Sequence, residues 1–335
     1  MNNTPHISII TPVWNGLPLL QECIESVLNQ SYTNWELLIS DDGSTDASRE
    51  YLRSLTDPRI RIFYQETNLG IFGNLNALFQ EATGEYTQLL CQDDYFTSSQ
   101  SLQSIHTYWE QAPADIAFVR FNYESVGKNL ATIFKAGKVP GVIYPSQAAL
   151  CFFTSGNIPG NLSNISLRTS LIGQIGGFRL DMPYAGDFEA WARIAGKHPF
   201  GIDAQNLVFV RRHPGAASNF LNKQGEIIRQ KARIVNRLFG KLANQEVYSV
   251  FLLKLMGTLV YDSLERWVGF KSALRGNDAY LKELDRVVKE SDFVFSSATG
   301  RWAVFMCSFG GRIGRKFLAS VLKKKHNQQY PDRSL

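Results

Sequence analysis

The sequence predicts an α/β fold with a mostly parallel sheet flanked by helices, followed by a helical C-terminal extension. Short apolar runs rich in β-branched residues alternate with amphipathic stretches of helix length through the first half of the chain. This alternation is typical of parallel strands joined by crossover helices. Polar clusters follow several of the apolar runs, and the chain becomes helical and basic after residue 220.

Strands and helices are expected in strict alternation at the start of the chain. The expected strands are His6–Thr11, Trp35–Ser40, Arg59–Gln65, Tyr86–Cys91 and Ile116–Asn122. The expected helices are Leu17–Asn29, Ala47–Leu55, Phe72–Ala82 and Ser99–Gln111. Residues 124–180 are rich in Gly, Asn and Ser, which is typical of long loops over a binding face.

Three polar clusters come directly after expected strands. They are TPVWN (Thr11–Asn15), DDGSTD (Asp41–Asp46) and QDD (Gln92–Asp94). Ligands bind at the carboxyl ends of the strands in open α/β sheets. We therefore expect these three loops to meet at one binding site.

The net charge divides the chain into two parts. Residues 1–220 hold 14 Lys and Arg against 20 Asp and Glu, which gives −6, whereas residues 221–335 hold 21 against 10, which gives +11. We expect residues 1–220 to form the binding and catalytic domain. Residues 221–335 then form a basic helical region that contacts the acceptor, a membrane surface or a second copy of the chain.

Cysteine spacing and hydropathy bear on location. The four cysteines are scattered, which favours a reducing compartment and no zinc site. The start of the chain does not read as a secretory signal, and no apolar run reaches the length of a membrane span. We expect a cytoplasmic protein, with the inner face of the cell membrane as the alternative location.

The turn after the first strand argues against two classes of nucleotide-binding enzyme. A dinucleotide fingerprint needs Gly-x-Gly-x-x-Gly at this turn. The chain has TPVWNGLPLL there, with two prolines and one glycine, and it has no Gly-x-x-x-x-Gly-Lys-Ser/Thr. A nicotinamide or flavin dehydrogenase and a P-loop enzyme are both disfavoured.

The neighbouring carboxylates Asp93 and Asp94 follow an apolar run and repel each other. A divalent cation such as Mg²⁺ or Mn²⁺ relieves this repulsion, because such ions bind one or two carboxylates together with phosphate oxygens and water. The alternative is a hydrophilic turn, where Asp is common. The pair alone does not decide between them.

Longer motifs carry a resemblance to a known family. Four segments matter, in this order: Ile7–Ser48 (ISIITPVWNGLPLLQECIESVLNQSYTNWELLISDDGSTDAS), Asn68–Asp94 (NLGIFGNLNALFQEATGEYTQLLCQDD), Gly176–Ile194 (GGFRLDMPYAGDFEAWARI) and Val210–Ser218 (VRRHPGAAS). Together they resemble family 2 glycosyltransferases over roughly the first 220 residues. The resemblance implies the GT-A fold and an inverting enzyme.

The resemblance also implies roles for individual residues. Pro12 and Trp14 would cradle the nucleotide base, Asp42 would receive its polar edge, and Asp93 would contact the ribose. The residues expected at the nucleotide are Thr11, Pro12, Trp14, Asp42, Asn68 and Asp93. Two alternatives remain open, because Asp42 also suits a turn before Gly43 and Trp14 also suits a hydrophobic core.

The same resemblance implies a metal site and a general base. Asp94 would ligate a divalent cation, Mn²⁺ or Mg²⁺, and His213 is a second candidate ligand. Asp187 would accept the proton of the attacking hydroxyl group. The alternative role for Asp187 is a helix cap.

The chain departs from the family pattern at three places. Cys91 stands where many relatives carry Asp, and Gly186 where they often carry Glu. Ser263 occupies the glutamine position of the Gln-x-x-Arg-Trp motif of processive relatives, although Arg266 and Trp267 are present. Ser263, together with the lack of spanning segments, favours a non-processive enzyme, whereas Cys91 suggests that the first carboxylate is dispensable or that the site differs slightly.

The expected function is a metal-dependent glycosyltransferase of cell-surface polysaccharide synthesis. It would move one sugar from a nucleotide-diphosphate donor, UDP or dTDP, to a hydroxyl of a glycan or lipid-linked saccharide. The alternatives are an inactive sugar-nucleotide binding protein and a basic α/β scaffold. Nucleic acid is not an expected partner, because no recognised binding module accompanies the positive charge.

Overall fold

The computed structural model describes residues 6–125, 141–213 and 226–331 and divides the chain into two compact units. The first unit comprises Met1–Ile143 and Pro159–His213, and the second Tyr144–Ile158 and Pro214–Leu335. The domain boundary expected at residue 220 lies outside the described residues.

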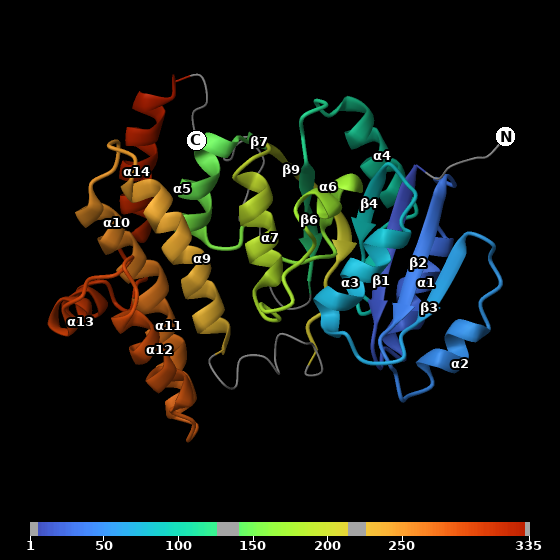
Figure 1. Cartoon of the computed structure of the whole chain (residues 1–335), viewed down its shortest axis with the longest axis horizontal. Coiled ribbons are helices and arrows are strands. Elements are labelled where there is room, and N and C mark those ends of the chain that lie inside the picture. The colour runs from blue at the N-terminus through green and yellow to red at the C-terminus, as the bar shows by residue number, and fades with distance from the viewer. Residues whose placement is uncertain (1–5, 126–140, 214–225, 332–335) are drawn as a thin grey trace. The chain divides into compact units, whose positions relative to one another are not determined.

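The first unit is built on a nine-stranded sheet with the strand order β3-β2-β1-β4-β8-β6-β9-β5, and β7 pairs with β9. Its strands are β1 (Ile7–Val13), β2 (Trp35–Asp41), β3 (Ile60–Tyr64), β4 (Tyr86–Leu89), β5 (Tyr95–Phe96), β6 (Phe118–Glu124), β7 (Val142–Ile143), β8 (Ile165–Arg168) and β9 (Phe200–Phe209). Strands β3, β2, β1 and β4 are parallel (Figure 1). Strand β8 pairs antiparallel with both β4 and β6.

Helices cover both faces of this sheet, so its central strands are buried on both sides. The helices are α1 (Leu19–Leu28), α2 (Ser48–Arg53), α3 (Gly70–Glu81), α4 (Ser101–Gln111), α6 (Ser170–Gln174) and α7 (Gly186–Ala195). Leu20 of α1 and Ile105 of α4 pack with Ile9 of β1 in one core cluster. Nearly every residue of β1 and β2 is buried, as expected for parallel strands that are covered on both faces.

The expected α/β class with C-terminal helices is confirmed, and each of the nine expected elements lies within a few residues of its predicted position. The expectation of long loops over residues 124–180 is wrong for much of that segment. It contains α5 (Pro145–Ser155), α6 and the central strand β8. Strand β8 is only four residues long, which is too short for a readable alternation of apolar and polar residues.

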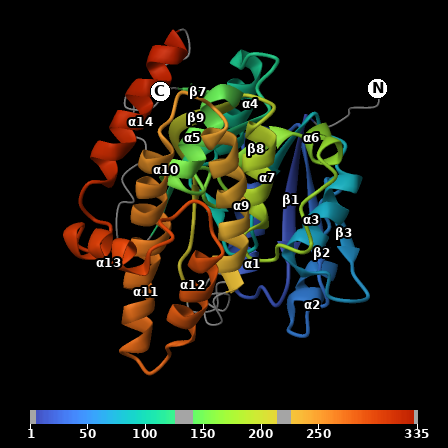
Figure 2. The same cartoon turned by 60° about the vertical axis from the view of Figure 1, so that its left-hand side comes forward.

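The second unit is helical. It comprises α5, α9 (Glu226–Ala243), α10 (Val250–Gly257), the π-helical turn η1 (Thr258–Ser263), α11 (Leu264–Ala273), α12 (Ala279–Lys289), α13 (Ala298–Cys307) and α14 (Arg315–Gln329). Helix α12 packs against both α9 and α11 (Figure 2). Over the described ranges, no helix is both long enough and apolar enough to span a bilayer.

A buried charge cluster joins η1, α11 and α13. The Asp262 carboxylate is completely buried and lies 2.7 Å from Nη2 of Arg266, while Nε of Arg301 lies 3.8 Å from its other oxygen. Arg266 and Arg301 are themselves 4% and 5% exposed. Asp262 is therefore the buried counter-charge of both guanidinium groups, and Arg266 has a second, exposed partner in Asp285 at 2.8 Å.

Replacing Asp262 by Asn is expected to lower the free energy of unfolding by roughly 3 kcal/mol, because it leaves buried positive charge without its partner. Urea unfolding of the purified variant measures this loss. Asp278→Asn is the matched control, since Asp278 forms an exposed ion pair with Lys282 and should cost less than about 0.5 kcal/mol. Equal unfolding free energies for the two variants would contradict the assigned role of the cluster.

Candidate active site

The three polar loops leave the same edge of the sheet. Val13 at the end of β1 lies beside Asp41 at the end of β2, and Ile10 lies beside Leu89 at the end of β4. Because these strands are parallel, their carboxyl ends bring the loops together. The expected meeting of the loops is therefore observed.

Side chains tie the loops to one another. The amide group of Gln92 holds the backbone of Trp14 on both sides: Oε1 accepts from the Trp14 N–H at 2.8 Å, and Nε2 donates to its carbonyl oxygen at 3.0 Å. Asn15, with a φ of 49°, donates its N–H to Oγ of Ser44 at 2.8 Å and accepts from the Thr45 N–H at 2.8 Å. The first loop is thus fixed by both of its neighbours.

The indole of Trp14 is 55% exposed, so the alternative of a core residue is wrong. Pro12 beside it is partly exposed, which leaves an apolar surface at the end of β1. Thr11 is completely buried within β1 and offers no surface to a ligand. Pro12, Trp14 and Asn15 are therefore the members of this loop with side chains at the surface.

Asp42 and Asn68 join the second loop to the start of α3. Oδ1 of Asp42 accepts from the Leu69 N–H at 2.7 Å, and Nδ2 of Asn68 donates to the carbonyl oxygen of Asp42 at 2.9 Å. Burial raises the pKa of Asp42, although the backbone N–H groups of Leu69 and Gly70 oppose the shift. The turn-residue alternative for Asp42 stays open, because its carboxylate does stabilise a local loop.

The two carboxylates after β4 lie in different surroundings. Asp94 is 4% exposed, and its oxygens accept from the Ser163 hydroxyl at 2.5 Å and from the Arg211 N–H at 2.9 Å. The side chain of Asp93 is 24% exposed, and its Oδ2 lies 2.9 Å from Nε2 of His213. Burial and the charge of Asp93 raise the pKa of Asp94 to about 7.

This acidic corner contains the donor atoms that a divalent cation needs. The ligand atoms of Cys91, Asp93 and Asp94 all lie within 4.8 Å of one another. Two carboxylates and a neighbouring imidazole suit Mn²⁺ or Mg²⁺, with the remaining positions left to phosphate oxygens and water. The thiol of Cys91 is a poorer ligand here, because burial raises its pKa well above the ordinary value.

Asp187 lies in the first turn of α7 and is partly exposed. The cap position of this helix is Ala185, so the helix-cap alternative for Asp187 is wrong. Glu189 is 2% exposed and forms an ion pair of 2.9 Å with Arg193. Of these two carboxylates, only Asp187 has the exposure that a proton acceptor for a substrate requires.

Comparison with known proteins decides the family. Residues 8–161 match the model of glycosyl transferase family 2. These residues form a family 2 glycosyltransferase domain. The family expected from the sequence motifs is therefore confirmed.

Several known glycosyltransferases are similar to this chain. The UDP-Glc:alpha-D-GlcNAc-diphosphoundecaprenol beta-1,3-glucosyltransferase WfaP of Escherichia coli is 26% identical over 76% of this chain and 94% of its own length. An uncharacterised glycosyltransferase of Haemophilus influenzae is 27% identical over 67% of this chain and 71% of its own.

Solved structures show the same fold at low sequence identity. TarS of S. aureus, residues 1–349 in complex with UDP-GlcNAc, aligns with a TM-score of 0.59 at 14% identity, over 96% of this chain and 92% of that one. The mannosyltransferase PcManGT of Pyrobaculum calidifontis, in complex with GDP-Man and Mn²⁺, aligns with a TM-score of 0.51 at 14% identity, over 95% and 86% of the two chains. The likeness supports the GT-A fold of this glycosyltransferase.

Two residues that position the acidic corner were missed in the sequence. Arg211 donates from Nη1 to the Asp93 carbonyl oxygen at 2.8 Å, forms an ion pair with Glu22, and lies 4.6 Å from the centre of the Tyr95 ring. Arg211 stands two residues before His213 in the sequence, and this short spacing from a candidate ligand could have identified it. Ser163 gave no signal, because it lies 69 residues from Asp94 in a segment expected to be loop.

The structure also explains one departure from the family pattern. A Cβ atom added to Gly186 would lie 2.7 Å from a ring carbon of Phe72. The Phe72 ring stacks on Phe178 at 5.3 Å and is buried. The glutamate that relatives often carry has no room beside this ring.

Proposed function

We propose that the chain is a metal-dependent, inverting and non-processive glycosyltransferase that moves one sugar from a nucleotide-diphosphate donor to a saccharide hydroxyl group. The observation that carries the proposal is the meeting, at one sheet edge, of an exposed indole with the carboxylates Asp42, Asp93 and Asp94. This edge combines a surface for a base with ligands for a cation, which a diphosphate donor requires.

The donor is assigned to the three loops. Pro12 and Trp14 contact the base, Asp42 accepts from its polar edge, and Asp93 contacts the ribose. Asn68 supports these contacts by holding the second loop through the carbonyl oxygen of Asp42, whereas the buried Thr11 has no contact with the nucleotide. UDP and dTDP are the proposed nucleotides, and the relatives WfaP and TarS, named with UDP-Glc and UDP-GlcNAc, favour UDP.

The cation site is assigned to Asp94, with His213 as the second ligand. A bound divalent cation neutralises the charge that builds on the departing diphosphate, so no general acid is needed at that oxygen. The complex of PcManGT with Mn²⁺ supports Mn²⁺ as the ion to test first. Ser163 and the backbone of Arg211 hold the Asp94 carboxylate in one orientation.

Asp187 is assigned as the general base. It accepts the proton of the acceptor hydroxyl group as that oxygen attacks the anomeric carbon. A single displacement inverts the configuration at this carbon. Glycoside hydrolases follow the same rule, since one displacement inverts the anomeric centre and two displacements retain it. The acceptor is proposed to be a lipid-linked saccharide of a cell-surface polysaccharide, since WfaP is named for a sugar on diphosphoundecaprenol.

Donor binding tests the nucleotide site directly. In the presence of Mn²⁺, UDP- or dTDP-sugars are expected to raise the melting temperature of the protein, and a donor at 100 times its dissociation constant should add about 2.7 kcal/mol of stability. Trp14→Ala should reduce this shift, because base stacking on an aromatic ring contributes about 1–3 kcal/mol. Tyr32→Ala is the control and should keep the full shift, because this partly exposed aromatic residue precedes the amino end of β2, at the opposite edge of the sheet.

An unchanged melting temperature across UDP-, dTDP- and GDP-sugars would contradict the donor site. A shift without any sugar product, in assays with diphosphate-linked saccharide acceptors, would favour the alternative of an inactive sugar-nucleotide binding protein. Mass analysis of the product identifies the acceptor and shows whether one sugar or several are added.

A further inference from the structure

Exposed apolar side chains gather at the end of the second unit, on α13, on α14 and on the loop between them. Trp302 and Met306 are 44% and 67% exposed, Phe309 and Ile313 are 69% and 57%, and Phe317 is 76%. Trp302 and Met306 lie on successive turns of α13, Phe309 and Ile313 lie in the loop, and Phe317 lies in the first turn of α14. Such large side chains are rarely left in water in a series, and an exposed apolar series marks a surface that binds something.

Helix α11 extends the same surface. Its Trp267 is 38% exposed, and a Cβ atom built on Gly310 would lie 3.6 Å from the Trp267 ring. The guanidinium carbon of Arg312 lies 4.7 Å from the centre of this ring. We call the six residues the aromatic face: Trp267, Trp302, Met306, Phe309, Ile313 and Phe317.

The connecting loop has an unusual backbone. Phe309 has a φ of 49°, and Gly310, Gly311 and Gly314 have φ of 68°, 79° and 88°. A bulky residue in the left-handed region is costly and uncommon. Phe309 adopts this costly conformation although its ring is exposed to water and adds little to the core. This favours a role for the ring in binding rather than in stability.

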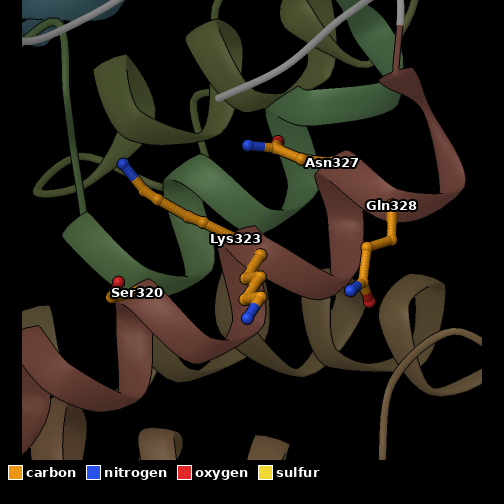
Figure 3. A pocket seen from close by; sticks show the side chains of 5 residues that line it. Ser320, Lys323, Asn327 and Gln328 are labelled. Atoms are coloured by element: carbon orange, nitrogen blue, oxygen red, sulfur yellow. The ribbon is translucent and has the colours of Figure 1, made fainter.

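The charge on α13, on α14 and on the loop between them is positive, although Asp285 pairs with Arg266 beside the Trp302 ring. Residues 293–331 contain seven Lys and Arg and no Asp or Glu. Arg312 and Lys316 are exposed within the apolar series itself. Farther along α14, Lys323 and Lys324 line a surface pocket of about 480 Å³ with Ser320, Asn327 and Gln328 (Figure 3). An occupant of this surface must therefore be both apolar and anionic.

We infer that the aromatic face binds the surface of an anionic lipid bilayer. Tryptophan rings and the stems of Arg and Lys suit the boundary between headgroups and acyl chains, and each cation gains from an anionic leaflet. This surface extends the proposed function by placing the enzyme on a membrane that carries a lipid-linked acceptor. The binding itself depends on neither the donor site nor catalysis.

A second copy of the chain fits the surface less well. A two-fold contact places the same patch on both partners, so cations would face cations. Lysine is also depleted from the centres of protein interfaces. The positive charge is a cost in a self-contact and a gain on an anionic leaflet, which favours the lipid surface.

Vesicle flotation with the full chain tests the inference. The protein is expected to float with vesicles of phosphatidylethanolamine and phosphatidylglycerol, and to bind phosphatidylcholine vesicles at least about tenfold more weakly. Phe309→Ala with Phe317→Ala should lower the affinity for the anionic vesicles about tenfold, and Arg315→Gln with Lys316→Gln by a similar factor. Leu28→Ala with Leu180→Ala, at exposed apolar sites of the first unit, should leave the affinity unchanged.

Three outcomes would overturn the inference. They are equal binding to both kinds of vesicle, full binding by the Phe309 and Phe317 variant, and a dimer in solution that this variant disrupts while the parent protein fails to float. Melting curves establish that each variant is folded. Asp187→Asn should float like the parent protein, so a failure of the proposed chemistry leaves this test intact.

Discussion

Asp187→Asn is expected to abolish sugar transfer while donor binding stays close to that of the unchanged protein. The amide keeps the size of the side chain and removes its ability to accept a proton from the acceptor hydroxyl group. A positioned general base typically contributes about 10²–10⁴-fold to the rate. Initial rates of transfer should fall by this factor, while the donor-induced rise in melting temperature should persist.

Asp181→Asn is the control for this variant. Asp181 lies in the segment before α7, is exposed, and forms an ion pair with Arg179, so its loss should change the rate little. Transfer by the Asp187 variant at the rate of the unchanged protein would remove Asp187 from the mechanism. If the variant loses both donor binding and sugar transfer, Asp187 instead shapes the donor site.

Asp94→Asn is expected to remove the response to divalent cations. The neutral amide cannot supply the anionic oxygen that Mn²⁺ or Mg²⁺ prefers. Transfer should fall by about 100-fold or more, since a bound cation supplies several kcal/mol of charge stabilisation at the leaving diphosphate. A titration of Mn²⁺ against the melting temperature, with and without donor, measures the effect.

Asp94 is buried and accepts two hydrogen bonds, so the variant also needs a measure of its fold. The melting temperature without metal or donor provides it, and Asp115→Asn, at an exposed site on the first unit, is the control. Chelation of the metal from the unchanged protein should reproduce the loss of transfer. A variant that keeps the full Mn²⁺ response would move the cation site away from Asp94.

The strand-end loops could be predicted from the sequence because parallel pairing leaves little choice. Once β1, β2 and β4 are recognised as neighbouring parallel strands, the residues that follow them must share one edge. Asp42, Asp93 and Asp94 were found in this way. Their chemistry needed the family motifs, since a pair of aspartates after a strand also suits a plain turn.

Contacts between distant segments could not be predicted. Ser163 meets Asp94 only because β8 enters the sheet antiparallel between β4 and β6. Helix α5 belongs with the C-terminal helices, although it precedes β8 in the chain. No local pattern reports such arrangements, because they depend on which surfaces remain to be covered once the rest of the chain has folded.

The contact between Gly186 and Phe72 has a consequence for the family at large. The ring of Phe72 takes up the volume that a side chain at position 186 would need. The two positions therefore divide one volume between them, although they lie on different helices. A homologue with glutamate at the position of Gly186 needs a smaller side chain at the position of Phe72. We therefore expect substitutions at these two positions to occur together in the family.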